Sequence, residues 1–131
     1  MQRKSRLGLL GCCIIVLLLV LLVVGVEVMD YVTLRPLAQQ IGTSPTKGAL
    51  VEHVTGLLKA NMGASREDIH YLLQGVGDGF EFRERGQVGN RSLENVTWTM
   101  ARTPAGGRIW ASWGLFYDVT GRLVEVQESD Y

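Results

Sequence analysis

The sequence predicts an α+β protein with one N-terminal transmembrane helix, followed by a small domain of two helices and a three-stranded antiparallel sheet. Three observations lead to this prediction. The chain opens with a long uncharged apolar run, apolar residues recur at helical spacing over residues 50–73, and residues 94–128 contain alternating β-like segments. Because the helices precede the strands, we expect an α+β layer with the helices on one face of the sheet.

The apolar run, Leu7–Val26, is 20 residues long. At about 1.5 Å per residue it can cross a hydrocarbon core of roughly 30 Å. A secretory signal has a shorter apolar region and an A-x-A-like cleavage site, whereas this run ends in "VVGVEVMD". The letters "LLGC", ending at Cys12, match a lipoprotein signal but follow too few apolar residues. We interpret residues 7–28 as a retained anchor, with a cleaved signal and a lipoprotein signal as the alternatives.

The charges around the run predict its orientation. Three basic residues lie within the first six positions, and the next basic residue after the run is Arg35. The positive-inside rule therefore places residues 1–6 in the cytoplasm and exports the chain beyond about Val28, as a single-pass protein of the cell membrane. The exported part has a net charge of about minus three and no basic patch, which argues against a nucleic-acid partner. The lipid bilayer and a protein of the cell envelope are the expected partners.

Residues 29–47 are interpreted as a juxtamembrane connector, since Pro36 is expected to kink or end any helix that continues from the membrane. The extracytoplasmic domain is then residues 48–131. Its first helix is predicted to start at Ser44-Pro45 and to end at Gly63, and a capping box at Ser65 begins the second helix. The expected buried faces are formed by Leu50, Val51, Val54, Leu57, Leu58, Ile69, Leu72 and Leu73.

Residues 75–92, "GVGDGFEFRERGQVGNRS", are predicted to be a glycine-rich loop, or at most a poorly paired edge hairpin through Phe80–Glu84. The segments "ENVTWTMART", "RIWASWGLFYD" and "RLVEVQES" are the three predicted strands. In the first of them, alternation places Val96, Trp98 and Met100 on one face.

The last two predicted strands are joined by a turn at Asp118–Gly121. Gly121 can supply the left-handed residue of a type I turn with a bulge, or it can close a plain four-residue turn. The two registers place opposite faces of the preceding strand on Val124 and Val126. At this point either Trp110 or Trp113 can be the core residue.

Two segments and a tryptophan-bearing strand resemble the SmpA/OmlA (BamE-like) small envelope lipoprotein fold over residues 48–128. The family has a capped helix, "G-M-T-x-x-x-V-x-x-x-L-G", and a closing hairpin, "L-x-F-x-x-x-G-x-L-x-x-V", which resemble "MGASREDIHYLL" and "SWGLFYDVTGRLVEV" here. The matching residues are Ser65, Ile69, Leu73, Phe116, Gly121, Leu123 and Val126. This chain departs from the family in having a full anchor in place of a lipidated cysteine just before the domain. The resemblance implies the family fold and a role in protein–protein contact in the cell envelope.

The sequence predicts no catalytic residue, no cofactor and no metal ligand. Cys12 and Cys13 both lie in the apolar run, so the exported domain has no cysteine. His53 has no other ligand-type residue near it apart from an adjacent glutamate, and His70 is expected on a solvated helix rim beside acidic residues. The glycines of "GVGDG", residues 75–79, follow a helix, whereas a phosphate-binding loop runs from a strand into a helix. We therefore expect a protein that is not an enzyme.

Aromatic residues are the candidate partner contacts. Trp110 and Trp113 lie on opposite faces of one strand, so one of them is expected outside the helix-covered core as a binding anchor. Phe80 and Phe82, in the charged segment "FEFRER", are the other candidates.

Two acceptor sequons, at Asn90 and Asn95, are candidate glycosylation sites if the source is eukaryotic. Our hypothesis for function is a single-pass, membrane-anchored extracytoplasmic module for protein interaction or assembly, without catalysis. The alternatives are an accessory subunit of a membrane complex that acts through its transmembrane helix, and a small-ligand sensor.

Overall fold

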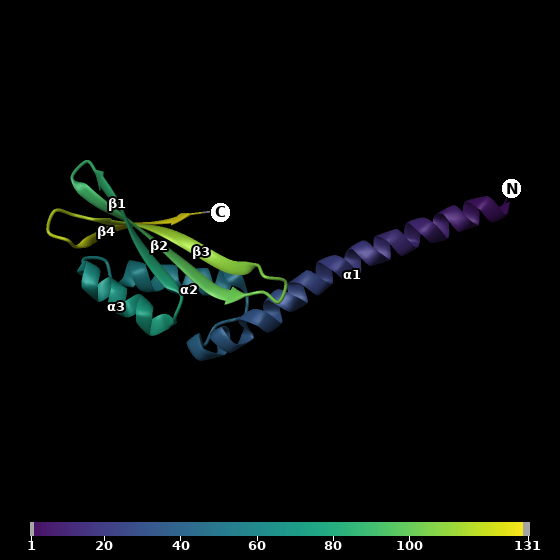
Figure 1. The fold of residues 1–131 in the computed structure, drawn as a ribbon, viewed down its shortest axis with the longest axis horizontal. Coiled ribbons are helices and arrows are strands. Elements are labelled where there is room, and N and C mark those ends of the chain that lie inside the picture. The colour runs from purple at the N-terminus through teal and green to yellow at the C-terminus, as the bar shows by residue number, and fades with distance from the viewer. Residues whose placement is uncertain (1, 130–131) are drawn as a thin grey trace.

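The computed structural model describes residues 2–129, with side chains from Gly8 onward except that of residue 27; the side chains of the predicted cytoplasmic segment, residues 1–6, and the last two residues of the predicted domain lie outside the described part. Its elements are α1 (Gln2–Ile41), α2 (Lys47–Ala60), α3 (Arg66–Val76), β1 (Phe80–Val88), β2 (Arg91–Arg102), β3 (Arg108–Tyr117) and β4 (Leu123–Ser129). The strands form one antiparallel sheet in the order β1-β2-β3-β4, and α2 and α3 lie along one face of it (Figure 1). The predicted α+β class is confirmed. The prediction of three strands is wrong, because the sheet has four.

α1 continues through the segment that was predicted to be a connector. It is 40 residues long, has Pro36 inside it, and ends at Ile41, before Gly42 at a φ of 86°. Proline removes one backbone hydrogen bond from a helix and usually kinks or ends it. Here Leu34 and Ala38, each only 1% exposed, pack into the domain core on both sides of the proline. Of the two alternatives, a kink or a helix end at Pro36, the helix end is wrong, because tertiary packing outweighs this local loss.

The caps of the two shorter helices are made by hydroxyl side chains. Thr46 caps α2 by accepting a hydrogen bond from the Ala49 N–H, so this helix begins slightly after the predicted start at Ser44-Pro45. Ser65 caps α3 as predicted and accepts from the Asp68 N–H. The predicted apolar faces are confirmed by the fully buried side chains of Leu50, Val54, Leu58, Ile69 and Leu73.

β1 occupies most of the segment that was predicted to be a glycine-rich loop. It pairs with β2 along its whole length, with one bulge between Glu84 and Gly86. The two strands are joined by the two residues Gly89-Asn90, and Gly89 has a φ of 65°, which suits the first position of a tight hairpin turn. The glycines therefore mark a bulge and a turn of a regular hairpin. The prediction of a loop over residues 75–92 is corrected in favour of the alternative, an edge hairpin, which is longer and better paired than expected.

The β3–β4 turn decides between the two registers that the sequence left open. The Gly121 N–H donates to the Asp118 carbonyl, and Gly121 has a φ of 79°. A register shift follows immediately in the ladder, so the turn is the bulged one. As a result Val126 lies opposite Leu115 on the helix-covered face.

The core lies between this face and the three helices. Its largest fully buried side chains are Trp98, Trp113 and Tyr117, all from the two central strands. α2 and α3 cover them, and the last turns of α1 complete the layer. Trp113 donates from Nε1 to Thr55 Oγ1 at 2.9 Å, and Thr55 in turn donates to Glu128 at 2.6 Å. This chain of hydrogen bonds joins α2 to β3 and β4.

Candidate functional site

The two faces of the sheet differ in what covers them. Directly opposite residues of an antiparallel pair point to the same side, so the pairing fixes the faces. The side packed against the helices carries the core residues of the two central strands: Glu94, Val96, Trp98, Ala111, Trp113 and Leu115. The other side, called the open face here, carries Leu93, Asn95, Thr97, Trp110, Ser112 and Phe116. No helix of the described chain lies on the open face (Figure 1).

The structure places the two candidate tryptophans on opposite faces, as the alternation predicts. Trp113 is fully buried under the helices, so its assignment as a partner contact is corrected: it is a core residue. Trp110 lies on the open face and is half-buried. The Arg108 guanidinium lies over the Trp110 ring, 5.3 Å from its centroid.

The two candidate phenylalanines face the helices. Phe80 stacks on Trp98 with ring centroids 4.9 Å apart, and Phe82 stacks on His70 at 3.8 Å. Both phenylalanines are half-buried and pack against the core cluster. The structure therefore separates the predicted contact residues, and Trp110 alone of the four lies on the open face.

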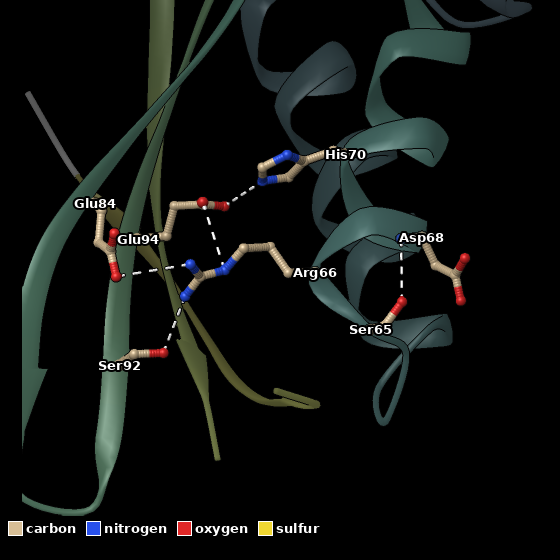
Figure 2. A network of polar contacts seen from close by, with 7 residues as sticks. All are labelled: Ser65, Arg66, Asp68, His70, Glu84, Ser92 and Glu94. Atoms are coloured by element: carbon tan, nitrogen blue, oxygen red, sulfur yellow. Dashed lines mark hydrogen bonds and ion pairs between the residues drawn. The ribbon is translucent and has the colours of Figure 1, made fainter. Parts of the chain in front are cut away.

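A polar network between α3 and the sheet is the main feature that sequence reasoning missed (Figure 2). Its centre is Glu94, whose side chain is only 4% exposed although it is a carboxylate. His70 Nε2 lies 2.7 Å from Glu94 Oε1, and Arg66 Nε lies 3.7 Å from Glu94 Oε2. Arg66 also reaches Glu84 at 3.7 Å and donates to Ser92 Oγ at 3.0 Å.

The network compensates a charge arrangement that is unfavourable on its own. Glu84 and Glu94 are direct partners across β1 and β2, and like charges in such a pair repel. Arg66 contacts both carboxylates, so it joins α3 to two strands at once. A buried carboxylate needs this pairing, because an uncompensated charge is costly to bury.

Tyr117 lies beside this network. The Arg66 guanidinium is 4.8 Å from the centroid of its ring. Burial raises the pKa of the Tyr117 hydroxyl strongly, and the negative charge of Glu94 raises it further. The hydroxyl is buried without a hydrogen bond of good geometry to any described group, although Glu94 is near enough to act on it.

A polar cleft of about 460 Å³ opens next to the network. It lies between the start of α3, the β1–β2 turn and the β3–β4 turn, and Arg66, Glu84 and Asp118 are among its lining residues. Hydrogen bonds from Thr120, and then from the Arg122 N–H, lower the pKa of the Asp118 carboxyl. Asp118 is thus engaged in holding its own turn.

The chemistry of the network is electrostatic. Among the described residues, His70 has no hydrogen bond to a serine, threonine or cysteine that it could activate as a nucleophile. Likewise, no group of three or more potential metal ligands occurs in the described part of the chain. His70 was expected on a solvated helix rim beside acidic residues, but its partner is Glu94 on the sheet. The arrangement fixes a helix to a sheet.

Glu94 had a signal in the sequence. It precedes Val96, Trp98 and Met100 in strict alternation, so a charged residue occupies a position on the core-facing side. Such a position predicts a buried carboxylate that needs a cation, although the sequence does not indicate which cation. Of the two sequons, Asn90 lies exposed in the β1–β2 turn and Asn95 lies half-buried on the open face.

Comparison with known proteins gives no match. No family model, no curated protein and no solved structure matches this chain. By length and composition, one described helix is a candidate membrane span, the part of α1 within Gly8–Ile41. The apolar window of this helix is not buried within the domain, and signal sequences near an N-terminus share its composition.

Proposed function

We propose that the chain is a single-pass, membrane-anchored extracytoplasmic module that binds a protein partner through the open face of its sheet, without catalysis. One observation carries the proposal. The helix that contains the exposed apolar run also contributes Leu34 and Ala38 to the domain core. The domain is therefore built directly onto the proposed anchor. A role in envelope protein contacts is also what the resemblance to the SmpA/OmlA fold implies.

The side chains of the run support a lipid environment for it. Its large apolar residues from Leu9 to Val26 are about half exposed or more in the isolated chain, and no other described element covers them. An apolar helix surface of this size is unfavourable in water and favourable in a hydrocarbon core. The basic residues before the run favour a cytoplasmic N-terminus and an exported domain.

The open face supports the protein partner. Helices cover one side of the sheet, so the partner has free access to the other. Trp110 and Phe116 are half-buried there, with Leu93 opposite Phe116 and small or polar residues at the other positions. Large aromatic anchors with polar surroundings are common at binding surfaces.

The first experiment tests the anchor and its orientation. A single cysteine is placed at Val119, which is 84% exposed in the β3–β4 turn, after Cys12 and Cys13 are replaced by alanine. In cells whose cytoplasmic membrane is intact and whose outer layers admit small reagents, a membrane-impermeant maleimide is expected to label Val119→Cys. The protein is also expected to stay with the membrane after alkaline carbonate extraction. Labelling only after lysis would contradict the orientation, and release by carbonate would contradict the anchor.

The second experiment tests the contact face. The full-length tagged chain is cross-linked in membranes, solubilised and captured, and its partners are compared between wild type, Trp110→Ala and Tyr71→Ala. Tyr71 is the matched control, because it is an exposed aromatic residue on α3, away from the open face. We expect the change at Trp110 to reduce capture at least tenfold, as for a binding hot spot, and the change at Tyr71 to have no effect. Equal capture by all three proteins would contradict the contact face.

A further inference from the structure

The end of the domain that lies nearest to the apolar part of α1 has a distinct composition. The β2–β3 connection, residues 103–107, lies beside α1 where that helix leaves the domain (Figure 1). A small, mostly apolar cavity of about 420 Å³ supports this placement, because Ile109 of β3 lines it together with residues of α1 and of the start of α2. These residues are Asp30, Tyr31, Leu34 and Lys47. We call this part of the domain, residues 27–47 and 102–110, the proximal end.

The position of the proximal end along α1 gives its depth relative to the bilayer. Helical residues rise by about 1.5 Å each, so Asp30 lies about 6 Å beyond Val26, the last residue of the apolar run. The headgroup layer of one leaflet is roughly 5–8 Å thick, which is half the difference between the thickness of the whole bilayer and that of its hydrocarbon core. The β2–β3 connection, which lies beside this part of α1, is therefore level with the lipid headgroups when the run spans the core.

The charge of the proximal end differs in sign from that of the rest of the domain. Residues 27–47 and 102–110 contain four basic and two acidic residues. The remaining residues after the run, 48–101 and 111–131, contain six basic and eleven acidic residues. The proximal end therefore has a net charge of +2 and the rest a net charge of −5, so an anionic surface attracts one end of the domain and repels the other.

The exposed side chains of the proximal end suit a lipid surface. Pro104, Ala105 and the two glycines after them are exposed and uncharged, so this turn can enter the headgroup layer. Arg102 and Arg108 flank the turn and are exposed as well. Basic side chains beside an uncharged turn suit the headgroup layer of an anionic membrane.

We propose that the proximal end is a lipid-docking surface: the β2–β3 turn lies in the headgroup layer of the leaflet that α1 crosses, with Arg102 and Arg108 on the phosphates of anionic lipids. This inference rests on the membrane anchor proposed above. Docking at a second point, beside the helix itself, fixes the tilt of the domain on the bilayer. The open face then has a constant orientation relative to the membrane surface.

The test measures where three positions lie relative to the lipid. The full chain, with Cys12 and Cys13 replaced by alanine, carries a single fluorophore-labelled cysteine at Ala105, Val119 or Val20. It is reconstituted in vesicles of phosphatidylcholine and phosphatidylglycerol that contain a nitroxide quencher on the lipid headgroup or on the acyl chain. We expect headgroup quenching at Ala105 and little at Val119, which lies in the turn at the other end of the sheet. The acyl-chain quencher is expected to act on Val20.

The arginines are tested by charge removal. Arg102→Gln and Arg108→Gln are each expected to lower the ratio of docked to undocked domain roughly fivefold, as for the loss of one basic residue near an anionic surface. Lys59→Gln is the matched control, because Lys59 is exposed at the far end of α2 and its loss removes the same charge. Vesicles of phosphatidylcholine alone are expected to lower quenching at Ala105 in the same way.

The outcomes separate this inference from the anchor on which it rests. Quenching at Val20 with none at Ala105 would overturn the docking surface and leave the anchor intact. Absence of quenching at Val20 would overturn the anchor itself. Equal quenching at Ala105 and Val119 would also overturn the docking surface, since it indicates non-specific adsorption. Quenching at Ala105 that does not depend on either arginine or on phosphatidylglycerol would overturn the role of the phosphates.

Discussion

Replacing Arg66 by methionine tests the polar network between α3 and the sheet most directly. Methionine keeps an unbranched apolar stem at this position and removes the charged guanidinium. In the wild type the guanidinium lies 3.7 Å from Glu84 and from Glu94, and it donates to Ser92 at 3.0 Å. The variant leaves two carboxylates opposite each other across β1 and β2, and the buried one keeps its contact with His70.

The expected loss of stability follows from the burial of the groups. Removing one partner of a fully buried ion pair costs about 3–5 kcal/mol, because it leaves an uncompensated charge. Here Glu94 is 4% exposed, but Arg66 is 31% exposed, so solvent screens part of its charge. His70 also stays on the other oxygen of Glu94. We therefore expect Arg66→Met to lower the free energy of unfolding by about 2 kcal/mol.

The assay is guanidinium denaturation of the full chain in detergent micelles, followed by tryptophan fluorescence. Trp98 and Trp113 are fully buried, so their emission reports the loss of the core. The double variant Arg66→Met/Glu94→Gln isolates the cause, because glutamine keeps the shape of Glu94 and removes its charge. We expect the double variant to recover at least half of the loss. If the second change adds its own loss to that of Arg66→Met, the reasoning from charge compensation is wrong.

Three further predictions concern single residues. Tyr117→Phe should leave stability unchanged at neutral pH, because the buried hydroxyl makes no hydrogen bond of good geometry to any described group, and it should reduce the loss of stability in alkali. The pKa of Tyr117 is raised in the folded state above the ordinary value of 10.0, so ionisation of the unfolded chain lowers the stability of the wild type as the pH rises from 10 through the folded pKa, and phenylalanine removes this loss. Denaturation midpoints at neutral and alkaline pH compare the two proteins. Gly79→Ala should lower the free energy of unfolding by about 1–3 kcal/mol, because Gly79 has a φ of +90° and a Cβ there would lie 2.6 Å from the Thr99 carbonyl oxygen. The control is Gly75→Ala, in α3 with open space around it, which should raise the free energy of unfolding by about 0.5–1 kcal/mol. Equal effects of the two changes in the same denaturation assay would contradict the steric reason. The Asp118 carboxyl should titrate below 3.8 in an NMR pH series, since hydrogen bonds lower its pKa. The support that Asp118 gives to the β3–β4 turn is present above pH 3.8 and is lost as the pH falls through the lowered pKa. A titration midpoint at or above 3.8 would refute the role of Asp118 in the turn.

The sequence predicted the elements whose local pattern and tertiary role agree. Ser65 begins α3 as a cap, and Ile69 and Leu73 are buried at the spacing that the pattern indicates. Alternation likewise placed Val96 and Trp98 on the core face of β2. In these segments the periodicity of the side chains and their burial have the same cause, so the local signal is sufficient.

Other elements depend on partners that are distant in sequence. β1 contains Gly86 and charged residues, so its local pattern is typical of a loop, and it is a strand because β2 pairs with it. Pro36 indicates a helix end locally, yet the helix continues because the residues around the proline pack on the domain. Glu94 is conspicuous in its strand, but its partners Arg66 and His70 come from a helix more than twenty residues away. Local patterns do not contain these pairings.

The contribution of α1 to the core has a practical consequence for shortened chains. A protein that begins at Val28 keeps Leu34 and Ala38, and with them one wall of the hydrophobic core. A protein that begins at Lys47, the first residue of α2, loses that wall and exposes apolar surface to water. Proteolysis just after the apolar run therefore releases a domain with its core complete, whereas a cut a few helical turns later removes part of that core.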